Sequence, residues 1–344
     1  MLRRFVFIVS LALLAASCGT DDQADRADDG PGGDDRATSQ PEDASTTSDP
    51  LSPIPGEFIV SRSPEGVEVR STETGASVAG VAIGPGGHGG AADITMPGGG
   101  GTVYAATEVT SCAADLQRAA VGGAEAERIG RGFSPAVDRN EDRLAYTPTI
   151  CPTGTPSVVI RELATGSEQA FELQDTPGRA DTTTVFPKSW NASGEILAIE
   201  VVHQLDGDVP QIEREIRLLD TESDLSLDDA TLLRPPRAGS QWRAPAFRGD
   251  LGTVAVSATR ADGDPDERFS IVEVDPTSGR VLGELTSTDQ LPRSLDFDRT
   301  GQHLLYVGTH GDRDQRAVGP PTLWRWSAAD GSVQLAEDVH QAVW

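Results

Sequence analysis

Four acidic residues in the second half of the chain have the spacing of a calcium-binding loop. Asp262, Asp264 and Asp266 alternate along the chain. Glu273 falls at the twelfth position, where an EF-hand places its bidentate glutamate. Position six needs glycine for a sharp turn but is Glu267, and the segment that reaches Glu273 has the pattern of a β-strand. We therefore predict an acidic, solvated hairpin tip here and no metal site.

The sequence also lacks the common motifs of catalytic and nucleotide-binding sites. It contains no G-x-S-x-G motif, no Walker loop and no dinucleotide fingerprint after a strand. Residues 75–79 (GASVA) lack the last glycine of a nucleophile motif and have the pattern of an outer strand. The five histidines are scattered, with His203 and His310 at similar ends of two separate strands. We predict solvated histidines there, with a shared metal site as the alternative, and no cofactor.

The N-terminus has the pattern of an export signal. Arg3 and Arg4 precede an apolar run over residues 5–16 that only Ser10 interrupts. About twelve apolar residues span roughly 18 Å as a helix, which is too short for a hydrocarbon core of about 30 Å. Residues 1–17 are therefore predicted to be a signal peptide.

The end of this segment, Leu-Ala-Ala-Ser followed by Cys18, resembles the lipobox of bacterial lipoproteins, although Ala15 stands where leucine is more usual. The resemblance implies that Cys18 carries a diacylglyceryl group and becomes the mature N-terminus. Acyl chains at about 0.8 kcal/mol per buried methylene would hold the chain on a membrane. An ordinary secretory signal with an incidental cysteine is the alternative.

Residues 18–55 are predicted to be a lipidated N-terminus and a disordered acidic tether. Residues 19–55 carry ten acids and two arginines and have almost no large apolar residue. Such a composition buries too little apolar surface to offset chain entropy, and its like charges keep the chain extended. An acidic binding tail is the alternative interpretation.

The composition of the whole chain excludes one class of function. The 344 residues include 54 acids and 28 bases, for a net charge of -26 and a sequence pI of about 4.4. Nucleic-acid binding needs a basic surface for the phosphates. We therefore expect no nucleic-acid partner.

An internal repeat organises residues 56–344. Each copy has a short strand that ends in an apolar anchor, then a polar turn, a longer apolar strand and two further strands. The anchors lie 41, 53, 57, 50 and 47 residues apart. They are Met96, Val137, Trp190, Phe247, Phe297 and Trp344. Four-stranded repeats of this length are typical of β-propeller blades.

The two ends of this region complete one another. The last residues, HQAVW, match the first strand of a unit, whereas the stretches EFIVSR, GVEVRST and ASVAGV match the second, third and fourth strands. One blade is therefore expected to combine both ends, which leaves no open sheet edge. The prediction is an all-β, six-bladed propeller closed by the C-terminal strand. The turns after the anchors, as in WNASGE and FDRTGQ, resemble the W-S-P-D-G turn of TolB-like propellers, and the repeat is WD40-like without the Gly-His and Trp-Asp pairs.

Cys112 and Cys151 remain as a pair if Cys18 carries lipid. Both follow the second strand of adjacent blades, whose equivalent loops lie on one rim, and an exported protein meets oxidising conditions. We predict a disulfide that closes a loop of about 38 residues and stabilises the fold by roughly 3–4 kcal/mol. Two free thiols are the alternative.

Two functions fit these expectations. The first is an extracytoplasmic, membrane-anchored scaffold that binds a protein, peptide or small ligand at a rim or at the channel mouth. The second is a hydrolase- or lactonase-like enzyme with its site in the central channel. The inner strands supply few ionisable residues for such a site, in no recognisable order: Asp93, Lys188, Arg243, Asp296 and His340. We therefore favour a non-catalytic binding scaffold, with no assigned catalytic residue.

Overall fold

The computed structural model describes most of the repeat region. The described residues are 58–63, 66–83, 93–97, 100–107, 112–123, 125–151, 154–174, 180–205, 211–235, 240–259, 269–311 and 317–344. The predicted signal peptide, Cys18 and the predicted tether lie outside these residues, as do Asp262, Asp264 and Asp266. Within the described ranges, no helix is long and apolar enough to span a membrane.

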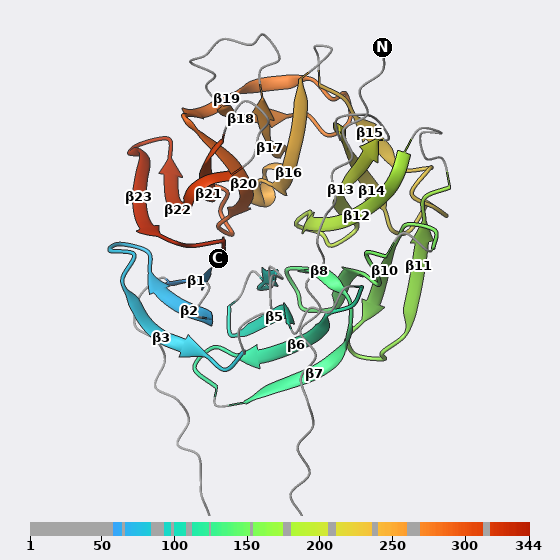
Figure 1. Ribbon diagram of the computed structural model, residues 1–344, viewed down its shortest axis with the longest axis horizontal. Coiled ribbons are helices and arrows are strands. Elements are labelled where there is room, and N and C mark those ends of the chain that lie inside the picture. Colours follow the sequence, from blue (N-terminus) through green and yellow to red (C-terminus); the bar gives the residue numbers. More distant parts are fainter. Residues whose placement is uncertain are drawn as a thin grey trace, which may run out of the picture. The chain divides into compact units, whose positions relative to one another are not determined.

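Six four-stranded antiparallel sheets follow one another around a ring (Figure 1). We number these blades I–VI in chain order. Blade I consists of β24 (Gln341–Val343), β1 (Phe58–Ser63), β2 (Gly66–Ser71) and β3 (Ser77–Val81). Blade II consists of β4 (Ile94–Thr95), β5 (Thr102–Thr107), β6 (Asp115–Ala120) and β7 (Ala126–Arg131). Blade III consists of β8 (Phe133–Val137), β9 (Arg143–Thr147), β10 (Ser157–Glu162) and β11 (Glu168–Glu172).

The second half of the ring repeats this order from the inner to the outer strand. Blade IV consists of β12 (Ala180–Trp190), β13 (Ile196–Leu205), β14 (Gln211–Asp220) and β15 (Thr231–Leu233). Blade V consists of β16 (Gln241–Phe247), β17 (Val254–Thr259), β18 (Phe269–Val274) and β19 (Val281–Thr288). Blade VI consists of β20 (Gln290–Phe297), β21 (His303–Gly311), β22 (Ala317–Ser327) and β23 (Gly331–Glu337). The only helical element of the described residues is the 3-10 turn η1 (Gly249–Leu251).

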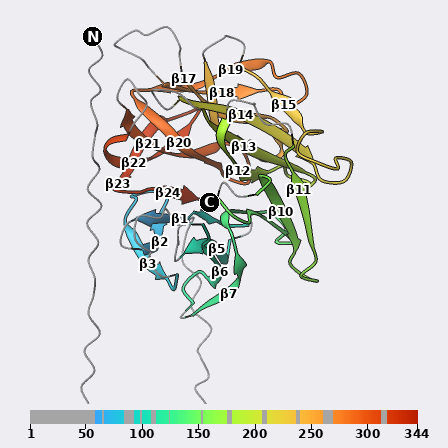
Figure 2. The same cartoon turned by 45° about the vertical axis from the view of Figure 1, so that its right-hand side comes forward.

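The predicted closure of the ring is confirmed. β24 pairs with β1 antiparallel, with Val60 opposite Val343 and Arg62 opposite Gln341. Figures 1 and 2 both show the C-terminal strand beside β1. The first and last strands of the propeller therefore share one sheet, and no inner strand is left unpaired.

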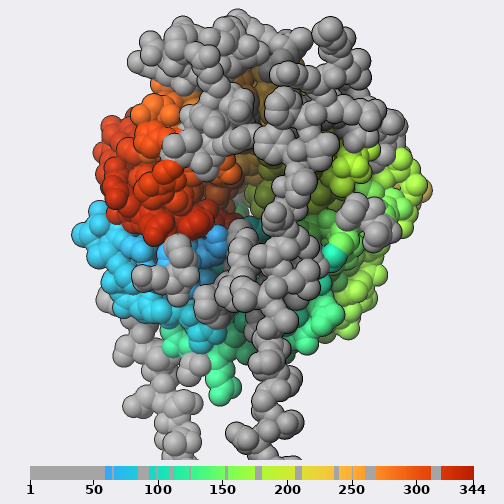
Figure 3. Space-filling model, viewed as in Figure 1, coloured from blue at the N-terminus to red at the C-terminus, as the bar shows by residue number. Residues whose placement is uncertain are grey.

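The hydrophobic core is divided into six clusters, one at each interface between neighbouring blades. The cluster between blades VI and I, for example, packs Ile59 against Leu305, Leu323 and Val339. Six blades with six such interfaces make a closed ring, and Figure 3 shows the red of blade VI against the blue of blade I. Packing between blades therefore holds the fold together, because each sheet buries both faces against its neighbours.

Burial decreases from the inside of each blade to the outside. The second strands β5, β9 and β13 are buried almost throughout, whereas the fourth strands β7, β19 and β23 are mostly exposed. This agrees with the continuous apolar runs of the second strands and the polar outer strands. Residues 77–79 lie in the fourth strand of blade I, β3, as the predicted outer strand requires.

The turn after the anchor is built in the same way in three blades. The side-chain oxygen of the residue after the anchor accepts hydrogen bonds from the backbone N–H groups of the residues four and five positions later. The three residues are Asp138, Asn191 and Asp298. Because the side chain replaces a backbone partner, Asp and Asn are favoured at this position.

Blade IV is longer than its repeat pattern predicts. The sequence indicates a short inner strand at FPKSW, but β12 runs over eleven residues and β13 and β14 over ten residues each. Thr182, Thr183 and Thr184 pair with the end of β13, so the β-branched residues before FPKSW extend the sheet.

Candidate functional site

The inner strands surround a central channel with two ends. We call the end with the connections between second and third strands the loop rim, and the end with the turns after the anchors the turn rim. A cavity of about 50 Å³ on the axis is lined by inner strands of five blades. Its charged residues are Asp93, Lys188 and Asp296, three of the five ionisable residues expected there.

A second cavity, of about 100 Å³, lies at the turn rim and shares Lys188 and Asp296 with the first. Arg139 of blade III donates a 2.7 Å hydrogen bond to the carbonyl of Arg299 in blade VI, on the opposite side of the ring. The side chain of Arg139 therefore narrows the channel at this end.

The polar side chains of the inner strands connect neighbouring blades. The side-chain amide of Gln341 makes two 2.8 Å hydrogen bonds to Ile94. Its oxygen accepts from the backbone N–H of Ile94, and its nitrogen donates to the backbone carbonyl of Ile94. The hydroxyl of Ser134 donates to Asp93 at 2.5 Å, and the indole N–H of Trp190 donates to the carbonyl of Ala136 at 2.9 Å. These groups hold the ring in register.

Asp296 is the most perturbed acid of the channel. Desolvation among the inner strands raises its pKa to about 7, and the nearby Asp298 adds to this rise. Backbone N–H groups of Trp344 and Phe297 partly oppose it. A carboxyl group with such a pKa can exchange a proton near neutral pH.

A cationic cluster lies where the channel meets the loop rim. Arg243 of β16 and Arg293 of β20 each stand four residues before the anchor of their blade, and Arg214 lies near the start of β14. All three are therefore at the strand ends next to the connections between second and third strands. Arg243 is 6% exposed, the side chain of Arg214 is 21% exposed, and Arg293 is exposed. The cluster thus extends from the interior to solvent.

Glu200 of β13 lies beneath these arginines. Its carboxylate pairs with the guanidinium of Arg214 and accepts a 3.4 Å hydrogen bond from the N–H of Ala244. Burial alone would raise the pKa of Glu200, but Lys188, Arg214 and Arg243 hold it below its usual value. The ammonium group of Lys188 lies 5.1 Å from the centroid of the Phe186 ring, on the strand paired with β13. Four cations from blades IV, V and VI therefore act on one region of the channel.

The positive charges of the arginines in this cluster repel one another. Desolvation first, and then Arg214 and Arg293, lower the pKa of Arg243 to about 10, although Glu200 opposes this shift. Desolvation and Arg214 also lower the pKa of Arg293. The chain thus gathers like charges at one place although acids outnumber bases in it nearly two to one.

One of the histidines occupies a different environment from the one expected. His203 is 1% exposed and contacts the hydroxyl of Thr183 at 2.9 Å, so the expectation of a solvated side chain was wrong for this residue. His310 and His340 are exposed, and the N–H of His340 donates to the carbonyl of Arg62. No group of three possible metal ligands occurs in the part of the chain that the structure describes.

Glu273, which has the spacing of a calcium ligand, and Asn191, in the turn after an anchor, already have partners. Glu273 accepts hydrogen bonds from Arg248 at 2.8 Å and from Thr253 at 2.5 Å. The side chain of Asn191 bonds to Ser193 and to two backbone N–H groups of its turn. Both side chains therefore stabilise local structure.

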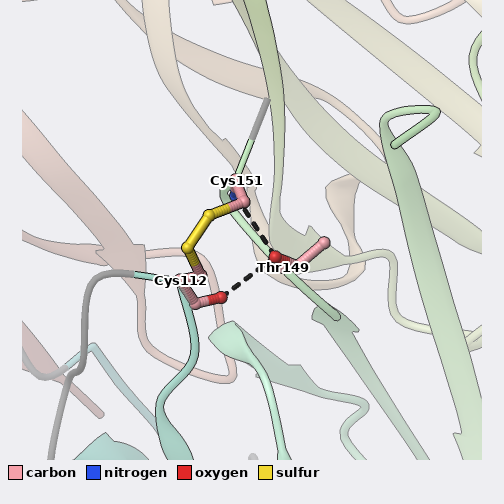
Figure 4. Close-up of a disulfide and its surroundings, with 3 residues drawn as sticks. All are labelled: Cys112, Thr149 and Cys151. Carbon is pink, nitrogen blue, oxygen red and sulfur yellow. Dashed lines mark hydrogen bonds between the residues drawn. A yellow bond between two sulfur atoms is a disulfide. The ribbon is translucent and has the colours of Figure 1, made fainter. Parts of the chain in front are cut away.

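Cys112 and Cys151 form a disulfide on the loop rim (Figure 4). Their Cα atoms are 5.0 Å apart, within the range of disulfides. Thr149 donates to the carbonyl of Cys112 and accepts from the N–H of Cys151. The bond joins blades II and III, the pairing that the sequence predicts.

Sequence reasoning selected Arg243 but missed Glu200, Arg214 and Arg293. One signal was available for Glu200, because it is the only charge in the apolar run ILAIEVV. A second signal was the matched position of Arg243 and Arg293 before their anchors. Arg214 belongs to a third strand, and nothing in its local sequence assigns it to the channel.

Comparisons with known proteins support the fold. No family model matches the chain, and no curated protein matches its sequence. A TolB structure from Agrobacterium tumefaciens is similar, with a TM-score of 0.53 and 12% identity over 82% of this chain and 90% of that one. A chain of a nidogen–laminin complex gives a TM-score of 0.53 and 11% identity over 83% and 97%. At such identities the likeness establishes the β-propeller fold and leaves the function open.

Proposed function

We propose that this chain is a lipid-anchored, extracytoplasmic β-propeller that binds its ligand at the loop-rim mouth of the channel without transforming it. The observation that carries the proposal is the use of the inner-strand polar groups. Asp93, Gln341 and Trp190 connect neighbouring blades through hydrogen bonds. Groups committed to the framework are unsuited to take part in bond making and breaking.

The anchored location rests on the sequence alone. The short apolar run before Cys18, followed by an acidic segment, supports lipidation and export. A Cys18→Ser variant should lose its acyl mass and leave the membrane fraction. Retention of that variant in the membrane fraction would contradict the proposed anchor.

Binding is tested by affinity isolation of the full-length chain from detergent-solubilised membranes. The tag belongs within residues 19–55, because a C-terminal tag would disturb the pairing of β24 with β1. Enrichment of one protein, or of one small molecule that elutes unchanged, supports the proposal. Recovery of neither, or of a chemically converted molecule, would overturn it.

A channel enzyme is the second candidate, and Asp296 favours it. The carboxyl group of Asp296 borders both channel cavities and has a pKa of about 7. An Asp296→Asn variant separates the two functions, since it would abolish proton transfer while the amide oxygen could still accept from Trp344. Loss of turnover in this variant, with binding retained, would establish catalysis.

A further inference from the structure

We propose that the two axial cavities form one binding site on the turn-rim side of the channel, and that its ligand is a small carboxylic acid with an aromatic or branched apolar body. This inference goes beyond the proposed function, which concerns the loop-rim mouth at the other end of the channel. The cavities have Thr95, Met96, Lys188 and Asp296 in common, so they adjoin one another along the axis.

The wall of the turn-rim cavity is largely apolar and comes from all six blades. The anchor of every blade lines it, and four of the anchors are aromatic: Met96, Val137, Trp190, Phe247, Phe297 and Trp344. The two cavities have volumes of about 100 and 50 Å³. Because an apolar cavity of about 150 Å³ binds a benzene-sized ligand, the site is large enough for one ring or one branched chain.

Lys188 supplies the positive charge of this site. It is the only lysine of the chain, it is half-buried, and it lines both cavities. Its ammonium group lies 5.1 Å from the centroid of the Phe186 ring, but it makes no hydrogen bond or ion pair with any residue in the described ranges. Glu200 is influenced by this charge, although its carboxylate pairs directly with Arg214. A half-buried ammonium group without a direct partner, on the wall of a cavity, can bind an anionic group of a ligand.

Asp296 favours a carboxylate as that anionic group. Burial raises the pKa of Asp296 to about 7, so near neutral pH a large share of the molecules carry the neutral acid. The N–H of Trp344 bonds to Oδ2 at 2.8 Å, which holds the carboxyl group in place beside the cavities. A neutral carboxyl group can donate its O–H to a ligand carboxylate, whereas an ionised one would repel it.

The other charged residues along the cavities orient the ligand. Asp93 lines only the deeper cavity, where its negative charge would repel a carboxylate. Arg139, Asp298 and Arg299 line only the turn-rim cavity, and two of these three are cationic, which favours the approach of an anion. The ligand carboxylate therefore binds at Lys188, and the apolar body lies among the anchors.

The test measures binding to the full-length protein in detergent by calorimetry at pH 7. The acids are phenylacetate and 4-methylpentanoate, and phenylacetamide and phenethylamine are the neutral and cationic probes of matching shape. We expect saturable binding of at least one acid, with phenylacetamide binding at least about tenfold more weakly than phenylacetate and phenethylamine not binding, because the charge-assisted hydrogen bond to Lys188 is lost. Absence of saturable binding by both acids, or equal affinities for phenylacetate and its amide, would overturn the inference.

A direct readout at Lys188 locates the ligand. Reductive methylation with ¹³C-labelled formaldehyde labels the only lysine of the chain and keeps its charge. The signal that is missing from a Lys188→Arg variant belongs to Lys188, and we expect the bound acid to shift it. An unchanged Lys188 signal at a saturating concentration of acid would place the ligand elsewhere and overturn the inference.

Variants separate the role of the charge from a structural role. Lys188→Met keeps the length of the side chain without its charge, and it should weaken binding of the acid at least about tenfold. Its affinity for the neutral amide should stay within about twofold of the wild type, which a merely misfolded variant would not show. Arg280→Gln is the control for loss of a distant cation, because Arg280 is exposed on the turn between β18 and β19. Equal affinity of Lys188→Met and the wild type for the acid would overturn the inference.

Discussion

The backbone N–H of Trp344 donates a 2.8 Å hydrogen bond to the carboxyl group of Asp296. Trp344 follows β24, the strand that closes blade I, and Asp296 belongs to the inner strand of blade VI. The contact therefore crosses the interface at which the ring closes. Because the pKa of Asp296 is raised to about 7, the charge at this contact changes near neutral pH.

We predict that Asp296 makes the free energy of unfolding depend on pH. Its pKa is about 7 in the folded protein, against 3.8 as the reference value, so the folded state favours the protonated form. The stability linked to this proton is present below pH 4 and is lost as pH rises through 7. Asp296→Asn mimics the neutral acid. The variant should therefore gain stability over the wild type between pH 5 and 8, by about 1–3 kcal/mol.

The control for this prediction is Asp298→Asn in the same turn. Although burial would raise the pKa of Asp298, hydrogen bonds from His303 and Thr300 hold it below its usual value. Its charge therefore stabilises the fold above the reference pKa, and this contribution is lost as pH falls through the lower folded value. Asp298→Asn should lose stability at pH 8, where Asp296→Asn gains it, so the two variants differ in sign. Urea unfolding of both variants at pH 5 and pH 8 gives the free energies of unfolding. If the stability gained by Asp296→Asn over the wild type did not change with pH, the prediction would be contradicted.

The disulfide should stabilise the protein mainly through the unfolded chain. Cys112 and Cys151 are separated by 39 residues, and the chain-entropy model gives about 3–4 kcal/mol for such a loop. Cys112→Ser and Cys151→Ser should each lower the free energy of unfolding by this amount. The double variant should lose no more stability than either single variant, because the same cross-link is absent from all three variants. Two titratable thiols in the oxidised wild-type protein would show that the bond is absent.

Gly75 and Gly279 form a matched pair that tests the contact between blades I and VI. Both lie in turns between third and fourth strands, with φ of +69° and +67°. A Cβ atom at Gly75 would lie 2.1 Å from the carbonyl oxygen of Leu335 on β23, whereas nothing lies within 4 Å at Gly279. Gly279→Ala should cost about 1 kcal/mol for its backbone conformation.

Gly75→Ala carries the same backbone cost and a steric clash in addition. We expect it to cost at least about 2 kcal/mol more than Gly279→Ala, because a backbone carbonyl must move. Thermal unfolding of the two variants side by side gives the difference. Equal losses would mean that blades I and VI are not in contact at this turn.

The closing strand should be essential for stability. Val339 is fully buried between blades VI and I, whereas the neighbouring His340 is exposed. Val339→Asp places an unpaired carboxylate in the core and should cost more than about 3 kcal/mol. His340→Asp should change the free energy of unfolding by no more than about 0.5 kcal/mol. Deletion of residues 339–344 should lower the melting temperature still further, and a deletion variant as stable as the wild type would refute closure by β24.

The blade architecture could be predicted from the sequence because it depends on local signals that recur. Each unit carries an apolar anchor, a turn residue such as Asn191 or Asp298 and an apolar second strand, and these determine strands and hairpins over short distances. Closure was predictable for the same reason, since HQAVW supplies the strand that the first unit lacks. The matched positions of Cys112 and Cys151 then led to their pairing.

The cationic cluster depends on the tertiary structure. Arg214, Arg243 and Arg293 are each unremarkable in their own strands, and they come together only because blades IV, V and VI curve around one axis. The raised pKa of Asp296 likewise follows from the inner strands that surround it, and the extension of blade IV brings Arg214 to Glu200. The sequence by itself determined the repeating units and their number, because each unit is specified by neighbouring residues: an apolar anchor, a polar turn and an apolar second strand. The ring decided which charges share the channel, because side-chain direction and the packing of distant blades set the distances between them.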